Sequence, residues 1–170
     1  EREKTVFLNE SYPLSFSFAE DPLQRVYRQY DRQAYWNLLI QVRNEVNKAI
    51  EKLRIVGELG SSLEAEVELY VKAGSQLFNI LAVLGEELRF VLITSEAKLL
   101  TINPPKQATH LKINAEELAL NIISTVGKKT KCARCWHRLA DVGQDVKHPD
   151  ICLRCVDNLP DGKGETRVYA

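Results

Sequence analysis

The sequence contains no methionine among its 170 residues, so Glu1 is not a native translation start. We therefore expect the chain to be cut from a longer protein or to be processed. No apolar stretch is long enough to span a bilayer, and no charged-then-apolar leader opens the chain. We expect no membrane partner and a reducing, cytoplasmic location in which thiols stay free to bind metal.

The chain also lacks net charge and any recognisable catalytic motif. Basic and acidic residues number 23 each, so the total charge favours neither nucleic acid, nor membranes, nor acidic ligands. There is no Gly-rich phosphate loop, no Gly-x-Ser-x-Gly nucleophile turn and no histidine pair at metal-ligand spacing. We therefore find no catalytic constellation in the sequence. A hydrophobic fraction of 45% and a charged fraction of 27% are typical of a soluble globular protein.

The first clear pattern in the sequence is helical and covers residues 23–56. Apolar residues recur there at alternating steps of three and four, which indicates one stripe along a helix. Gly57 and Gly60 are expected to end it. The stripe consists of Leu39, Val42, Val46, Ala49, Leu53 and Val56.

The period changes to two over residues 63–73, which predicts a strand with one buried face. Ser61 and Glu64 also fit a helix capping box, but the alternation outweighs it. The fold class that we predict is α+β. The further elements that we expect are a short helix over 75–84, strands over 88–94 and 118–126, and a weaker strand over 97–102.

From residue 128 onwards the apolar periodicity stops, and too few apolar residues remain to build a core. The four cysteines lie here as two Cys-x-x-Cys pairs, Cys132 with Cys135 and Cys152 with Cys155, separated by 16 residues. This spacing is typical of a zinc ribbon, in which two tight turns present four thiolates to one tetrahedral ion. We predict one structural zinc ion, because four protein ligands leave no position for an activated water.

Other readings of the cysteines and histidines are weaker. Two disulfides would suit an oxidising compartment, and the spacings usual for iron–sulfur clusters differ from this one. His137 or His148 could replace a cysteine, but we expect both to be exposed or locally hydrogen-bonded, because four cysteines already satisfy the ion.

The first cysteine pair lies in a basic run that no acid interrupts between residues 128 and 138. Cationic side chains attract phosphates, and the flat ring of Trp136 could stack on an unpaired base. This pattern is typical of a surface that reads a single-stranded RNA loop. A solvated basic turn, with Trp136 serving as the small core of the module, explains the same residues equally well. The basic residues are Lys128, Lys129, Lys131, Arg134 and Arg138.

Several motifs, in this order, resemble the C-terminal part of bacterial isoleucyl-tRNA synthetases. In the body of the chain they are Ala34-Tyr35-Trp36, then residues 42–48, 60–65 and 87–92. The tail, with residues 131–137 and 151–156, is similar to the terminal zinc module of that family.

The resemblance implies a class I aminoacyl-tRNA synthetase, which joins isoleucine to its tRNA with ATP. The family's catalytic signatures, His-Ile-Gly-His and Lys-Met-Ser-Lys-Ser, are absent from this sequence, so this piece should be inactive alone. The implied domains are the end of a helical anticodon-binding bundle (1–56), an α+β junction (57–127) and a zinc module (128–170).

The resemblance further implies that the module engages the anticodon stem-loop. Arg134 and Trp136 are then expected to contact loop bases, and Lys131 and Arg138 to contact phosphates. The implied partners are the tRNA for isoleucine and the rest of the synthetase in cis, with the protein a monomer. The competing hypotheses are a zinc module that only docks on its parent enzyme, and a free-standing zinc ribbon that binds a protein, which the missing methionine disfavours.

Overall fold

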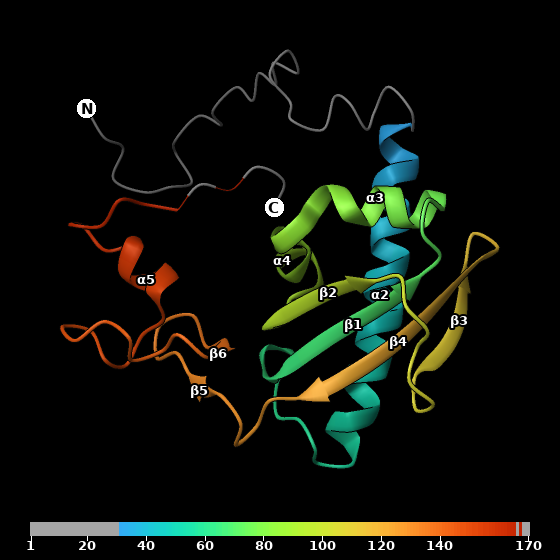
Figure 1. Cartoon of the computed structure of the whole chain (residues 1–170). Coiled ribbons are helices and arrows are strands. Elements are labelled where there is room, and N and C mark those ends of the chain that lie inside the picture. Colours follow the sequence, from blue (N-terminus) through green and yellow to red (C-terminus); the bar gives the residue numbers. More distant parts are fainter. Residues whose placement is uncertain (1–30, 166, 168–170) are drawn as a thin grey trace, which may run out of the picture.

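The computed structural model describes residues 31–165 and Arg167. The predicted α+β class is confirmed: helices pack on a mixed four-stranded sheet, and a small cysteine-containing module follows (Figure 1). The part of the predicted bundle that falls on residues 1–30 lies outside the described residues. Within the described part of the chain, no helix is both long and apolar enough to cross a membrane.

The long helix α2 spans Arg32–Ile55 and covers one face of the sheet (Figure 1). Its N-terminus is capped by Asp31, whose carboxylate accepts a 3.0 Å hydrogen bond from the amide of Ala34. The predicted stripe is buried along its middle but not at its end, because Val56 is 66% exposed. The fully buried side chains of α2 include Tyr35, Leu39, Val42 and Val46.

The sheet has the order β2-β1-β4-β3, with β1 parallel to β2 and the other neighbours antiparallel. Alternate residues of β1 are buried in the core that the sheet shares with α2, as the period of two predicts. The strands are β1 (Ala65–Val71), β2 (Glu96–Leu100), β3 (Thr109–Ile113) and β4 (Glu116–Ser124).

The capping pattern of Ser61 and Glu64, which we ranked below the alternation of residues 63–73, is also present, immediately before the strand. Residues Ser62–Glu64 form the 3-10 turn η3, and the Ser61 hydroxyl accepts a hydrogen bond from the amide of Leu63. The carboxylate of Glu64 accepts a 2.9 Å hydrogen bond from the amide of Gly60. Both patterns are therefore used, one in the turn and one in the strand that follows it.

The predicted strand over 88–94 is wrong. Helix α3 (Gln76–Leu84) leads through the 3-10 turn η4 (Gly85–Glu87) into a second short helix, α4 (Leu88–Leu92). The branched and aromatic residues of this run favour a strand locally, but burial overrides that preference. Leu88 and Leu92, four apart on one helical face, are each 1% exposed in the main core.

One strand, β3, was not predicted at all. It forms a hairpin with β4 through Asn114 and Ala115, whose φ angles are both positive, at 48° and 69°. Such turns usually contain glycine, so the sequence Asn-Ala gave no hairpin signal. The predicted strands over 97–102 and 118–126 correspond to β2 and β4.

The C-terminal module contains the short strands β5 (Thr130–Lys131) and β6 (Arg138–Leu139) and the helix α5 (Leu153–Asp157). It lies beside one end of the sheet (Figure 1) and has a hydrophobic cluster of its own, built on cysteines. Helix α2 and the sheet, by contrast, share one core. We call α2 to β4 the body and residues 128–165 the zinc module; the domain boundaries at 56 and 127 stay a prediction.

Candidate metal centre

The first cysteine pair lies in the turn between β5 and β6. These strands pair in the register Thr130 with Leu139 and Lys131 with Arg138. Within the turn, the amide of Cys132 donates to the carbonyl of His137 (2.9 Å) and that of Trp136 donates to the carbonyl of Cys132 (3.0 Å). The turn closes with Trp136 in the left-handed region, at φ 65°.

The second cysteine pair lies at the start of α5. Cys152 is the N-cap residue of this helix, and Cys155 lies within its single turn. The two pairs are held together by backbone, because the amide of Ala133 donates to the carbonyl of Asp150 over 2.9 Å. A carboxylate oxygen of Asp141 also accepts from the amide of Leu153 at the helix start, which satisfies one of its free donors.

The four sulfurs form a compact group. All of them lie within 4.8 Å of one another, and the pairs Cys132–Cys155 and Cys135–Cys152 are each separated by 3.7 Å. Four sulfurs at about 2.3 Å from a tetrahedral zinc ion would be separated by about 3.8 Å. A disulfide needs about 2.05 Å, so the geometry fits one metal ion rather than two cross-links. The cofactor that the cluster suits is one zinc ion, as predicted.

Electrostatics separate the thiol of Cys132 from those of Cys152 and Cys155. Burial would raise the pKa of Cys132, but nearby backbone amides outweigh it and lower that pKa to about 6. Burial raises the pKa of Cys152 to about 11 and raises the pKa of Cys155 further. Without a cation, Cys152 and Cys155 would therefore stay protonated at neutral pH. A bound divalent metal ion supplies the positive charge that can keep all four cysteines as thiolates.

Neither histidine of the module joins the cysteine cluster, in agreement with our expectation. His137 is buried, and its Nδ1 lies 3.1 Å from the carbonyl oxygen of Cys135. Burial lowers the pKa of His137, and the nearby arginines lower it further. His148 forms a local contact, because its Nδ1 lies 3.2 Å from a carboxylate oxygen of Asp145.

Trp136 and Lys131, two of the predicted RNA contacts, lie together on the surface. The Trp136 side chain is 61% exposed, so it does not form the core of the module. The ammonium of Lys131 lies 5.5 Å from the centroid of the Trp136 ring, in a cation–π arrangement.

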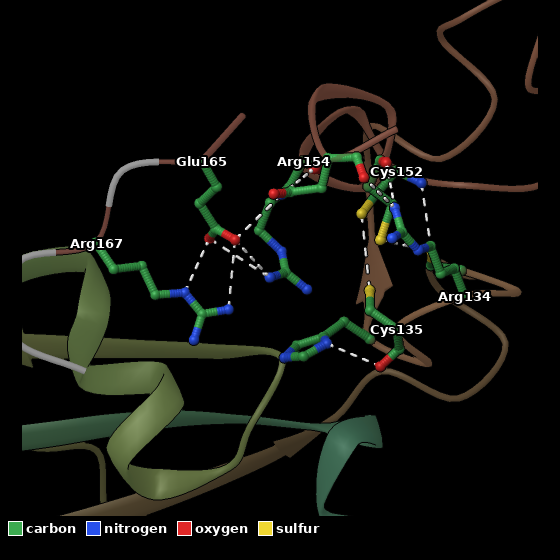
Figure 2. A network of polar contacts seen from close by, with 10 residues as sticks. Arg134, Cys135, Cys152, Arg154, Glu165 and Arg167 are labelled. Atoms are coloured by element: carbon green, nitrogen blue, oxygen red, sulfur yellow. Dashed lines mark hydrogen bonds and ion pairs between the residues drawn. The ribbon is translucent and has the colours of Figure 1, made fainter. Parts of the chain in front are cut away.

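The two predicted arginine contacts already bond within the protein. The guanidinium of Arg134 donates to the carbonyls of Cys155 (2.8 Å) and Asn158 (3.1 Å) at the end of α5 (Figure 2). Arg138 donates to the carboxylate of Glu64 at 2.8 Å, and its side chain is 19% exposed. For Arg138 these contacts favour a role in docking over the predicted phosphate contact.

Sequence reasoning missed a cluster that joins the tail to the body. Glu165 pairs with the guanidinium groups of Arg154 and Arg167 (Figure 2). Both guanidinium groups also lie over the ring of Phe90 in α4, at 5.3 Å and 4.0 Å from its centroid. The charges alternate locally in the tail, but no sequence signal points from them to an aromatic ring so far away in the chain.

A family model described as a zinc finger found in FPG and IleRS matches residues 130–158. The isoleucine–tRNA ligase of Methylococcus capsulatus is 41% identical over 169 residues, which is 99% of this chain and 17% of that protein. The isoleucine–tRNA ligases of Coxiella burnetii and Shewanella amazonensis are 48% and 45% identical over 82% and 81% of the chain.

The chain thus spans less than a fifth of the length of these relatives. The similarity to the Methylococcus protein nevertheless extends over the body as well as the zinc module. The chain belongs to the isoleucine–tRNA ligase family and corresponds to the C-terminal region of such an enzyme.

Proposed function

We propose that this segment binds the anticodon stem-loop of the tRNA for isoleucine on behalf of a parent ligase, which attaches isoleucine to that tRNA with ATP. The segment itself has no catalytic residue, and it acts in cis with the rest of the enzyme in the cytoplasm. Cys132, Cys135, Cys152 and Cys155 hold one zinc ion that keeps the binding surface folded.

The observation that carries the proposal is the exposed ring of Trp136. A tryptophan exposed over 61% of its surface leaves a large apolar face in water, and stacking on a base would cover it. The backbone at this position is also fixed, because the Trp136 amide donates to the carbonyl of Cys132, one of the four clustered cysteines. A side chain on a fixed backbone has less entropy to lose when it binds.

Charge beside the ring supports an RNA ligand over a protein ligand. Lys131 and Lys128 are exposed cations near the same turn, and either can meet a phosphate that flanks a stacked base. Arg134 is exposed as well, but its Nη1 already donates to two backbone carbonyls, so only its remaining N–H groups are left for RNA. We therefore assign base contact to Trp136, with Arg134 beside it, and phosphate contact to Lys131.

The test is tRNA binding by the full-length ligase that contains this segment. Trp136→Ala should weaken binding by about 5- to 150-fold, the equivalent of about 1–3 kcal/mol for one stacked base, whereas Trp136→Phe should retain most of it. Val146→Ala is the matched control, because Val146 is 94% exposed on another loop of the module. Normal affinity and charging with Trp136→Ala would rule out the base contact.

The phosphate contact has its own signature. Lys131→Ala should weaken binding of cognate and non-cognate tRNA alike and lower the salt slope by about 1, whereas loss of a base contact discriminates between anticodons. Lys147→Ala provides the control, since Lys147 is an exposed lysine of the same module away from Trp136. An unchanged salt slope with Lys131→Ala would remove Lys131 from the interface.

A second candidate function is a purely structural module that docks on its parent enzyme. The observation in its favour is the pairing of Arg138 with Glu64, which uses a basic residue of the module to bind protein. The two candidates make opposite predictions for Trp136→Ala: the docking module predicts normal tRNA binding, and the RNA-binding module predicts the loss given above.

A further inference from the structure

The zinc module and the body have separate hydrophobic clusters. The module cluster consists of cysteines with a few aliphatic neighbours, and none of its members belongs to the core that α2 shares with the sheet. The contacts that join the two parts are therefore mainly polar. Hydrophobic burial has no preferred direction, whereas hydrogen bonds depend on angle, so polar contacts fix how the module is oriented.

On the body, the carboxylate that pairs with Arg138 of the module is that of Glu64. It is only 12% exposed and sits in η3, directly before β1. Its Oε2 accepts from the amide of Gly60, while its backbone carbonyl accepts both the amide and the hydroxyl of Thr125, at 2.9 Å and 2.6 Å. Glu64 is thus fixed from the body side, and its other oxygen, Oε1, is directed to the module.

On the module, Arg138 uses four donors, of which three reach the body and one bonds within the module. Its Nη2 and Nε donate to Glu64 Oε1 at 2.8 Å and 3.2 Å, and its Nη1 donates to the carbonyl of Lys129 at 3.2 Å. Its backbone amide donates to the hydroxyl of Ser95, a fully buried residue directly before β2, and this hydroxyl donates in turn to the carbonyl of Leu63. A single residue of β6 is therefore held by both its side chain and its backbone.

Arg138 is also close to the proposed RNA surface. It pairs with Lys131 across the β5–β6 ladder, and Trp136 precedes it by two residues in the same turn. The other contacts between module and body are the ion pairs of Lys129 with Glu66 and Glu96, and the stacking of His137 and Arg154 on the single ring of Phe90. Groups stacked on one ring can turn about it, and the Lys129 ammonium is a point charge on a flexible stem, whereas the guanidinium and the backbone amide of Arg138 donate in fixed directions.

We infer that Glu64 and Arg138 form a positioning pair that fixes the orientation of the zinc module on the body, and so sets the direction in which Trp136 and Lys131 face the RNA. Breaking the pair releases the module without unfolding it, because its cysteine cluster and its ladder stay intact. This inference rests on the proposed function only where it concerns RNA; the fixed orientation is a property of the protein alone.

The orientation can be measured without RNA, by residual dipolar couplings of amides in the 170-residue chain. The unsubstituted protein should fit one alignment tensor for β1, β4 and the module together. Glu64→Gln preserves the acceptor for Gly60 but presents an amide to Arg138, so body and module should then require two tensors. The matched control is Glu51→Gln, which breaks an exposed ion pair with Arg54 on α2.

Two further measurements make the result decisive. Zinc content and the amide spectrum of the module should be unchanged in Glu64→Gln, which separates release from unfolding; Arg138→Lys serves as a second, milder variant. In the full-length ligase, if the binding-competent orientation falls to about a tenth of the population, the apparent Kd for tRNA rises about tenfold.

Each outcome decides a different claim. One shared tensor in both Glu64→Gln and Arg138→Lys would overturn the positioning pair. Two tensors with tRNA affinity lost in both Glu64→Gln and Trp136→Ala would support it fully. Two tensors with Trp136→Ala binding normally would support the pair and refute the proposed function. Two tensors with only Trp136→Ala impaired would refute the claim that orientation serves RNA binding.

Discussion

Removal of zinc should unfold the module and spare the body. Among the described residues, three partly buried aliphatic side chains complete the cysteine cluster: Leu139, Val142 and Ile151. Full burial of one such side chain contributes about 1.5–3 kcal/mol, so three half-buried ones supply on the order of 3 kcal/mol together. Structural zinc typically contributes about 10 kcal/mol or more, which is the larger share by far.

The assay is amide hydrogen exchange on the chain before and after treatment with a chelator strong enough to strip the ion. Residues 130–157 should lose protection, including the bonded amides of Cys132 and Trp136. The amides of β1 and β4 should keep theirs, because their core contains no residue of the module.

One control guards against an incomplete reaction: elemental analysis must show that no zinc remains. If zinc is absent and the amides of Cys132 and Trp136 are still as protected as before, then the metal does not hold the module together. The reasoning above, from the small apolar cluster to the dependence on metal, would then be refuted.

Two further predictions concern the body. Leu92→Ala should destabilise it by about 2–5 kcal/mol in urea unfolding, because this side chain of α4 is 1% exposed; an unchanged midpoint would mean that α4 does not pack as described. Hydrogen bonds from Tyr70 and Asn121 lower the pKa of Glu68 below 4.5, so its contribution is present above pH 4.5 and is lost as the pH falls through the lower, folded-state value. Glu68→Gln should flatten the stability profile of the body between pH 6 and pH 3, relative to the unsubstituted chain, as followed by circular dichroism.

Periodicity and residue spacing correctly predicted those parts of the fold that a local sequence pattern determines. The apolar stripe located α2, the alternation located β1, and the two Cys-x-x-Cys pairs located the metal centre. In each case the pattern is short-range, because the residues that make it lie within one element or one turn. Such patterns can be recognised in a single sequence without knowing which residues they contact in the folded protein.

The misses have a different physical origin. Residues 88–92 favour a strand by composition, and only the burial of Leu88 and Leu92 in the main core makes them a helix. The hairpin between β3 and β4 uses Asn-Ala where glycine is usual. Glu64 and Arg138 are 74 residues apart, and no local pattern pairs two charges at that distance. These features depend on tertiary contacts, which the sequence does not display.

The same contacts change how the basic run near the metal is understood. In the sequence, charge alone makes all five cations between residues 128 and 138 candidates for phosphate, and the family resemblance singles out Lys131 and Arg138. In the structure, Lys129 forms ion pairs with Glu66 and Glu96, and Arg138 pairs with Glu64. Lys129 and Arg138 are partly buried, and neither can turn to a phosphate without leaving a partly buried carboxylate of the body unpaired.

The geometry separates the run into two groups. Lys129 and Arg138 bind the module to acidic side chains of the body, while Lys128 and Lys131 remain exposed, and Lys131 lies beside Trp136. Under the proposed function, docking and RNA contact are then not alternatives for the module as a whole, because each would use its own subset of the same charges. Substituting the whole run at once would confuse the two roles, whereas Lys131→Ala and Glu64→Gln address them separately.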